Sequence, residues 1–187
     1  MIQIAGSSFI DEHYRVLMLR GVNLGGSSKV PFTPDGSTYR SEGFFNHRDV
    51  SFVGRPFLLE DADEHYSRLR AWGFNTLRFL VTWEAIEHAG PGILDTEYLD
   101  YLYKVVRKAG EHGFMVFIDP HQDVWSRFSG GDGAPGWTFE TVGLDITKFK
   151  STAAAIVHQT HGDPFPRMIW PTDRKSTRLN SSHVSQS

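Results

Sequence analysis

The sequence predicts an α/β fold built on a parallel sheet. One pattern, a helix that stops at Gly followed by Phe and an apolar strand, occurs twice, at Ala71–Phe74 and at Glu111–Phe114, 40 residues apart. An apolar run such as Phe114–Ile118 is typical of a buried parallel strand, and alternating helices and strands favour a parallel sheet. The chain supplies about three such units, whereas a (β/α)8 barrel takes about 250 residues. We therefore expect the first part of a larger doubly wound or barrel domain.

The N-terminal third predicts strands and a long loop. Phe9-Ile10, with residues 11–14 as a turn, indicates a small hairpin, and Val16–Leu24 indicates a strand that ends in the loop Gly25–Lys29. Residues 30–56 are irregular and rich in Pro, Gly, Ser and Phe. Loops this long in a compact domain are usually functional or disordered.

The first helix–strand unit covers residues 58–81. Apolar side chains recur at helical spacing along Leu58–Trp72, and we expect them on one buried face: Leu58, Ala62, Tyr66, Leu69 and Trp72. Gly73 stops the helix because glycine adopts the left-handed conformation easily. Phe74–Val81 is then a strand.

The second unit begins at Asp95, an N-cap residue. The helix that it caps runs from Thr96 to His112, with a predicted buried face of Leu99, Leu102, Val105, Val106 and Ala109. Gly113 stops it before the strand that opens at Phe114. A third helix is expected to start over residues 152–158, and the three prolines of Pro164–Pro171 predict an extended or turned segment.

Composition excludes several classes of function. The chain has 187 residues, a net charge of −3 and no cysteine. Nucleic acids and anionic membrane surfaces need clustered positive charge, so neither is expected as the main partner, and disulfides and thiolate metal sites are excluded. We find neither a signal peptide nor a run of about 18 apolar residues, which predicts a cytoplasmic protein without a transmembrane helix.

The C-terminal residues 173–187 differ from the rest of the chain. They hold no aromatic residue and only Leu179 and Val184 as aliphatic residues, so they bury too little to fold. Residues 173–183 also equal the in-frame translation of a common sequencing-library adapter. We therefore expect a native portion over residues 1–172 and a non-native, disordered tail over residues 173–187.

Polar side chains follow the apolar run 114–118, at the end of a strand where α/β folds place their working sites. They are Asp119, His121, Gln122, Asp123 and Trp125. Sugars suit this mixture, because their hydroxyls take hydrogen bonds while their C–H faces pack on aromatic rings. Alternatively, His121 is a core histidine whose hydrogen bonds are satisfied within the protein, and it binds no sugar. Arg78, within an apolar strand, needs a partner, either a core carboxylate or a catalytic carboxylate that it orients.

Two catalytic alternatives stay open from the residues alone. Glu84 and Asp123 follow adjacent strands and could form the carboxylate pair of a glycosidase, about 5 to 9.5 Å apart. The favoured alternative is that both only bind ligand or face solvent. Asp119, His121 and Asp123 could instead hold a metal ion, although no second histidine cluster completes the shell. The glycine-rich residues 129–136 fit no phosphate or dinucleotide motif and predict a flexible rim.

Three segments together resemble one family: Leu19–Lys29, Gly73–Glu84 and Asp119–Phe128. They look like glycoside hydrolase family 5, in the branch of endoglycoceramidases and fungal glucosylceramidases and steryl glucosidases. The resemblance covers nearly all of residues 1–172. Its most specific motif is Asp119-Pro-His-Gln-Asp123. The family implies a (β/α)8 barrel, of which this chain would hold an incomplete N-terminal part of about three βα units.

The resemblance also implies a retaining mechanism with two glutamates. In the family the acid/base Glu follows an Asn at the end of strand four, and the nucleophile ends strand seven. No Asn-Glu-Pro segment occurs in this chain, so we expect both glutamates to be absent and the chain to be inactive. Its substrate class would be a glucosylated lipid, such as glucosylceramide or a steryl glucoside, which allows peripheral contact with a membrane. We expect no cofactor and no metal.

Four residues match the family's sugar pocket. Arg78 matches the strand-two Arg that supports the nucleophile, and His121 matches the strand-three His that lines the cleavage subsite. Lys29 and Asp123 match positions that bind sugar hydroxyls in this branch. The family leaves Glu84 without a catalytic role, which favours Asp123 as a sugar ligand over the carboxylate pair.

Overall fold

A three-stranded parallel sheet forms the centre of the protein. The structure, a computed structural model, describes residues 2–37 and 42–155. The strands β3 (Gly21–Leu24), β4 (Thr76–Thr82) and β5 (Met115–His121) lie side by side in chain order. Both pairings are parallel, with Asn23 opposite Arg78 and Arg78 opposite Phe117. The predicted parallel sheet is confirmed.

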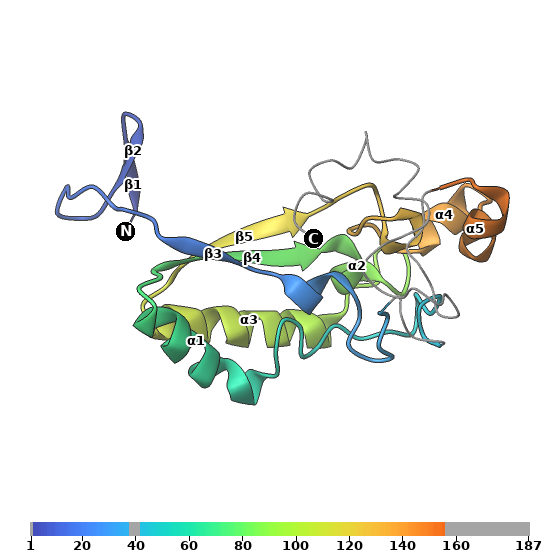
Figure 1. Cartoon of the computed structure of the whole chain (residues 1–187), viewed down its shortest axis with the longest axis horizontal. Helices are drawn as coiled ribbons and strands as arrows, with labels where there is room; N and C mark the ends of the chain where they lie inside the picture. The colour runs from blue at the N-terminus through green and yellow to red at the C-terminus, as the bar shows by residue number, and fades with distance from the viewer. Residues whose placement is uncertain (1, 38–41, 156–187) are drawn as a thin grey trace.

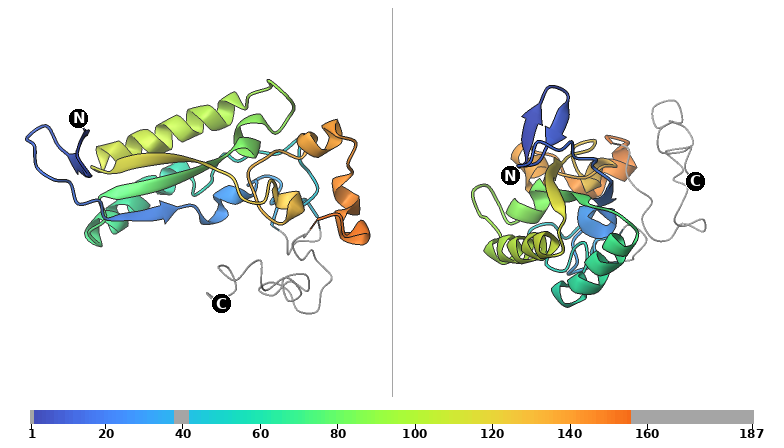
Figure 2. Two further views of the ribbon diagram at one scale, coloured as in Figure 1. Left: turned by 90° about the horizontal axis from the view of Figure 1, so that it is seen from above. Right: turned by 90° about the vertical axis from the view of Figure 1, so that its left-hand side faces the viewer.

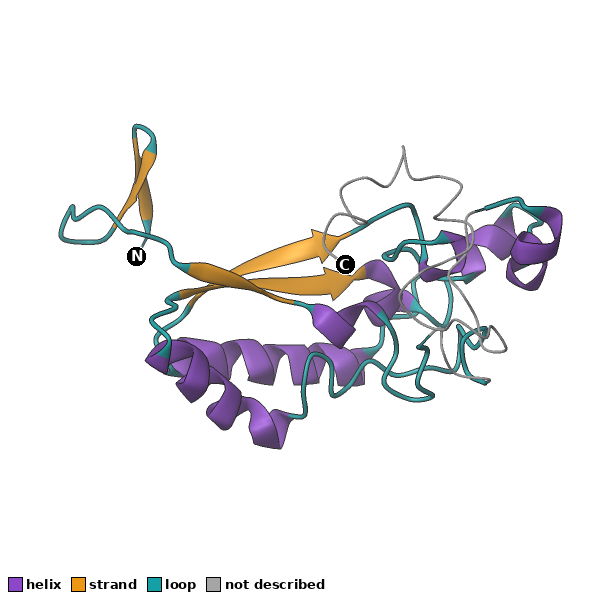
Figure 3. Cartoon of the chain, in the orientation of Figure 1, coloured by secondary structure: helices purple, strands orange, loops and turns teal. Residues whose placement is uncertain are grey.

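Helices cover one face of this sheet. The helices α1 (Ala62–Ala71) and α3 (Thr96–Glu111) lie against the same face and against each other (Figures 1 and 2). The shorter helices gather where the strands end (Figure 3): α2 (Trp83–Glu87), α4 (Trp137–Thr141), α5 (Phe149–Thr152), and the 3-10 turns Gly26–Lys29, Arg127–Ser129 and Ile146–Lys148. A further 3-10 turn, Leu59–Asp61, leads directly into α1. Among the described residues, no helix is long and apolar enough to cross a membrane.

Two predicted helix stops have the expected geometry. Gly73 and Gly113 have φ of +88° and +78°, in the left-handed region that glycine reaches without strain. Asp95 caps α3 as predicted, because its carboxylate accepts a hydrogen bond from the Tyr98 backbone N–H at 2.8 Å.

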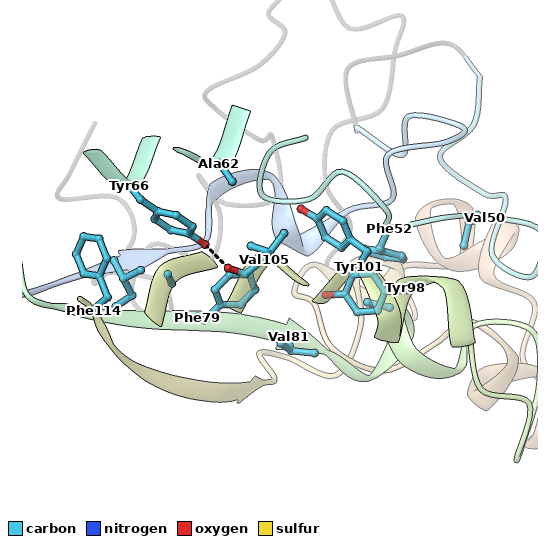
Figure 4. Packing of buried hydrophobic residues seen from close by; sticks show 13 residues of the cluster. Val50, Phe52, Ala62, Tyr66, Phe79, Val81, Tyr98, Tyr101, Val105 and Phe114 are labelled. Carbon is cyan, nitrogen blue, oxygen red and sulfur yellow. Dashed lines mark hydrogen bonds between the residues drawn. The ribbon is translucent and has the colours of Figure 1, made fainter. Parts of the chain in front are cut away.

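The core lies between the sheet and the two helices (Figure 4). Leu77, Phe79 and Val81 alternate along β4 and point to the helices, as the two-residue period of a strand requires. The Tyr66 hydroxyl donates to the Val105 carbonyl at 3.1 Å and ties α1 to α3. Burial raises the pKa of Tyr66, so this phenol stays a neutral donor.

The predicted buried faces of both helices are partly wrong. In the first helix, α1 proper starts only at Ala62, and Leu58 and Trp72 are exposed. In α3, Tyr98 and Tyr101 are buried while Leu99, Leu102 and Val106 are only half-buried. Each tyrosine can be buried because its ring packs among aromatic neighbours, and the Tyr101 hydroxyl donates to the Phe57 carbonyl at 2.5 Å.

The N-terminal segment forms a hairpin, but one placed earlier than predicted. Strands β1 (Gln3–Ala5) and β2 (Ser8–Ile10) pair antiparallel beyond the N-terminal end of the sheet (Figure 1). The predicted turn after Ile10 also forms, since Ile10 bridges to Val16. The strand predicted from Val16 begins only at Gly21, because its partner β4 begins at Thr76. Before Gly21, the Asn75 side chain forms hydrogen bonds with the backbone of Met18 and Arg20.

Two further predictions about elements are wrong. Strand β5 is not buried on both faces, since Phe117 and Ile118 are exposed at the last strand of the described sheet. The helix expected over residues 152–158 does not continue beyond Thr152, where Ala153 takes a left-handed φ of +55°. Residues 156–158 of that prediction, Pro164–Pro171 and the tail 173–187 lie outside the described residues.

Candidate functional site

Polar side chains occupy the sheet face that the helices leave open. Because side chains alternate along a strand, Arg78 on β4 and Asp119 and His121 on β5 point away from the core formed by Leu77 and Phe79. Leu80 lies opposite Asp119, so Arg78, two residues earlier on the same face, is its diagonal neighbour.

Arg78, Asp119 and His121 form a hydrogen-bonded chain. Arg78 Nη2 lies 2.8 Å from Asp119 Oδ2, and His121 Nδ1 lies 2.8 Å from the same oxygen. Asp119 thereby orients the imidazole and holds Nδ1–H as the donor. The carboxylate partner that Arg78 needs is thus Asp119, on the neighbouring strand.

Asp132 connects this chain to Lys29. Lys29 Nζ lies 2.9 Å from Asp132 Oδ2, and Asp132 Oδ1 lies 3.4 Å from His121 Nε2. Asp132 is buried, with only 4% of its surface exposed. Both Asp132 Oδ1 and His121 Nε2 are buried without a hydrogen-bond partner among the described residues. With Nδ1–H as the donor of the neutral ring, Nε2 is an acceptor like Asp132 Oδ1, so each of the two atoms needs a donor of its own.

Asp123 joins the site through its backbone. Its N–H donates to the Asp132 carbonyl at 2.9 Å, and the Asp132 N–H donates back at 2.8 Å. This bridge needs Gly131, since a Cβ there would lie 1.8 Å from the Asp123 carbonyl oxygen. Asp123 is half-buried beside Asp132, so the structure brings together all four predicted binding residues, Lys29, Arg78, His121 and Asp123.

Glu84 does not form the catalytic pair that its position allowed. Both its carboxylate oxygens accept from Arg127 Nε, at 2.9 and 3.0 Å, and both side chains are almost fully buried. Arg127 also donates to the carbonyls of Phe44 and Asn46. Burial raises the pKa of Glu84, and the Arg127 charge opposes that rise. Glu84 therefore holds two loops together and cannot reach a ligand.

The glycine-rich segment 129–136 is packed rather than forming a rim. Residues 132–136 are buried, and Glu84 N–H donates to the Gly133 carbonyl at 2.7 Å. Asp132 and Arg127 were not predicted as site residues, because both act through partners that are distant in the chain. The local signal was a run of glycines, which permits close backbone approach.

Metal ligation has no geometric support in the part of the chain that the structure describes. No group of three or more His, Asp or Glu side chains there could hold a metal ion. Asp119 and His121 are bound to each other, and Asp119 also faces the Arg78 cation. The Arg78 guanidinium lies 2.8 Å from Asp119 Oδ2 and would repel a metal ion bound to this carboxylate.

Comparison with known proteins identifies the family. The family model of cellulase (glycosyl hydrolase family 5) matches residues 34–163. The chain belongs to this family. The resemblance drawn from the three motif segments is thus confirmed. Glycosyl hydrolase family 5 proteins are (β/α)8 barrels, and the three parallel strands with their helices are an incomplete, N-terminal part of one.

Individual relatives indicate which members of family 5 the chain is similar to in sequence. A glucosylceramidase of Aspergillus fumigatus is 53% identical over 182 residues, which cover 96% of this chain and 24% of that protein. An ergosteryl-beta-glucosidase of Saccharomyces cerevisiae is 42% identical over 187 aligned residues, covering 90% and 24%. The crystal structure of Cryptococcus neoformans sterylglucosidase 1 superposes with a TM-score of 0.82 at 45% identity, covering 92% of this chain and 25% of that one. The chain spans about a quarter of the length of these relatives.

Family 5 membership gives the site its place in the barrel. Barrel enzymes act at the C-terminal ends of their strands. His121 is the last residue of β5, and Lys29 and Asp132 belong to the segments that follow β3 and β5. His121, Lys29 and Asp132 therefore lie at the C-terminal ends of the described strands.

Proposed function

We propose that the protein to which this chain belongs hydrolyses the β-glucosidic bond of glucosylated lipids, such as glucosylceramide or a steryl glucoside. One observation carries the proposal. Lys29, Asp132, His121, Asp119 and Arg78 form one connected polar network on the open face and at the strand ends. The relatives named glucosylceramidase and ergosteryl-beta-glucosidase support glucose as the sugar.

Each polar residue has a proposed task in binding the sugar. Lys29 and Asp123 bind sugar hydroxyls, and His121 lines the subsite where the bond breaks. Arg78 supports the carboxylate nucleophile from beside the site. The Lys29–Asp132 pair and the Arg78–Asp119 pair keep these groups in place before the ligand arrives, since both acids are largely buried.

We propose that the bond-breaking step uses two glutamates of the parent protein and none of this chain. A retaining mechanism needs one Glu as nucleophile and one as acid/base. Glu84 is occupied by Arg127, which leaves it out of this chemistry. In this proposal the chain forms one wall of the sugar pocket. By itself, the 187-residue polypeptide would not hydrolyse the substrate.

Three measurements test the proposal. The 187-residue chain should not release nitrophenol from a chromogenic β-glucoside, yet glucose should perturb the NMR signals of the His121 ring. Lys29→Ala should weaken glucose binding by about tenfold, as expected for the loss of one charge-assisted hydrogen bond. If the chain hydrolysed the β-glucoside and Asp123→Ala abolished this activity, the proposal that the chain is inactive would be contradicted. Unchanged His121 signals at saturating glucose would contradict the sugar site.

A further inference from the structure

One buried guanidinium contacts the segments that follow all three strands of the described sheet. Arg127 itself lies after β5, and its Nε donates to both carboxylate oxygens of Glu84 in α2, after β4, at 2.9 and 3.0 Å. Its Nη1 and Nη2 donate to the carbonyls of Phe44 and Asn46, in the long loop between β3 and α1. Arg127 is 2% exposed, so these contacts are internal and do not depend on what covers the open face of the sheet.

The Lys29–Asp132 ion pair joins two of the same three segments. Lys29 belongs to the turn that follows β3, and Asp132 lies after β5, with Lys29 Nζ 2.9 Å from Asp132 Oδ2. Charges on separate segments pair at this distance only while both segments keep their positions. A restraint that fixes the two segments beforehand lowers the entropy lost when the pair forms.

Glu84 fixes both ends of the stretch that carries Asp132. Its carboxylate binds Arg127, and its backbone N–H donates to the Gly133 carbonyl at 2.7 Å. Directly before Gly133, the backbone of Asp132 exchanges hydrogen bonds of 2.8 and 2.9 Å with that of Asp123. The backbone of Asp132 is therefore held from several directions, and Arg127 connects it to the loop after β3.

Resting on the proposed function, we propose that Arg127 is a positioning residue of the sugar pocket, which places Asp132 against Lys29. Arg127 does not contact the sugar, because its side chain is buried and its nitrogens are engaged within the protein. Lysine cannot take over this task. The guanidinium presents its donors in a rigid planar fork, whereas the single ammonium of a lysine cannot reach Glu84 and both loop carbonyls together.

A double-mutant cycle tests this inference in the 187-residue chain. Arg127→Lys alone should weaken glucose binding by about fivefold. Lys29→Ala should weaken it by about tenfold in the unaltered chain but by less than about threefold in the Arg127→Lys background, because Lys29 is then already displaced from Asp132. NMR titration with glucose measures these affinities, and circular dichroism checks that each variant is folded. If Arg127 only stabilised the fold, Lys29→Ala would cost the same factor in both backgrounds.

A core variant separates positioning from general stability. Val105 is fully buried in α3, in the core between the sheet and the helices. Val105→Ala removes core packing, so it should lower the urea midpoint as Arg127→Lys does, yet leave glucose affinity within about twofold. A comparable loss of affinity in Val105→Ala would contradict the inference, because destabilisation alone would then explain the effect of Arg127→Lys.

Glu84→Asp is a second variant, in case Arg127→Lys does not fold. It keeps the counter-charge of Arg127 but shortens the side chain by one carbon, and it should weaken glucose binding by about threefold. Unchanged glucose affinity in Arg127→Lys and in Glu84→Asp would overturn the inference.

Hydrogen exchange tests the positioning without a ligand. The amides of Asp123 and Asp132 donate to each other's carbonyls. They should exchange at least about tenfold faster in Arg127→Lys, and within about twofold of the unaltered rate in Val105→Ala, because this bridge opens locally. Unaltered exchange of both amides in Arg127→Lys would overturn the inference, as would equal acceleration in Val105→Ala.

The outcomes also separate this inference from the proposed function. If the unaltered chain binds no glucose, the sugar site fails, and the exchange of the Asp123 and Asp132 amides still decides whether Arg127 positions Asp132. If glucose binds and Lys29→Ala costs about tenfold in both backgrounds, the sugar site stands and the positioning role of Arg127 fails.

Discussion

At the scale of single residues, the role of a side chain here depends on partners that are distant in the chain. Glu84 and Asp119 are both acids at or near a strand end, yet Arg127 occupies Glu84 completely while Asp119 orients His121. Sequence patterning could assign both acids to the correct end of the sheet. It could not distinguish them, because Arg127 lies 43 residues from Glu84 and no local pattern pairs the two.

The buried Glu84–Arg127 pair should dominate the stability of the loops around the site. Glu84→Ala leaves a buried guanidinium without its counter-charge, which costs about 3 to 5 kcal/mol of unfolding free energy. Asp100→Ala, which breaks the exposed Asp100–Lys104 pair in α3, should cost about 0.5 kcal/mol or less. Urea unfolding of both variants measures the difference. Equal losses would contradict a structural role for Glu84.

His47 should make the protein less stable in mild acid. Burial lowers the pKa of His47 below its ordinary value, and the neighbouring cations Arg48 and Arg127 act in the same direction while Glu140 opposes them. The unfolded chain therefore takes up a proton first as the pH falls below about 6.5, and the folded state loses stability. His47→Gln should reduce the fall in unfolding free energy between about pH 7.5 and about pH 5.5. The same fall in both proteins would contradict this assignment.

At the scale of elements, local patterns predicted the elements well and their packing less well. The glycine stops at Gly73 and Gly113 and the Asp95 cap need only local backbone geometry, and all three are confirmed. The buried tyrosines of α3 were missed because a tyrosine becomes a core residue only once its hydroxyl finds an acceptor, here Phe57 for Tyr101. The packed segment 129–136 was missed because its glycines serve close contacts rather than mobility.

Substitution by alanine should change stability in opposite directions at Gly131 and Gly110. Gly131→Ala places a Cβ against the Asp123 carbonyl and should cost about 2 kcal/mol or more, with loss of glucose binding. Gly110→Ala meets nothing within 4 Å in α3 and should stabilise the helix by about 0.5 to 1 kcal/mol. Thermal unfolding of the two variants measures both effects, and a harmless Gly131→Ala would show that the bridge can shift.

At the scale of the whole molecule, the sheet has one covered and one open face. A cavity of about 850 Å³ lies between the hairpin and the open face, lined by Phe9, Leu19, Val22, Met115 and Phe117 among others. The number and direction of the strands were predictable from the sequence, but the exposure of β5 was not. Burial depends on which elements lie beside a strand, and an apolar run carries no information about its neighbours.

The open face should make the 187-residue chain self-associate. Exposed apolar surface next to strand edges promotes pairing between molecules. Phe117→Glu should reduce this association, because it removes apolar surface and places a carboxylate opposite Arg78 in the neighbouring strand. Val142→Glu, a change at an exposed residue after α4, is the control. Sedimentation velocity should show smaller species for Phe117→Glu alone, and monomers of the unaltered chain would contradict the prediction.

The polar network also connects separate elements of the fold. Lys29 follows β3, Arg78 belongs to β4, Asp119 and His121 belong to β5, and Asp132 lies in the segment beyond. The ion pairs therefore connect all three strands. His121 Nε2 and Asp132 Oδ1 lie 3.4 Å apart and connect β5 to the segment that follows it. A ligand that contacted both β5 and this segment in the folded state alone would therefore stabilise the fold, because its binding free energy adds to that of folding.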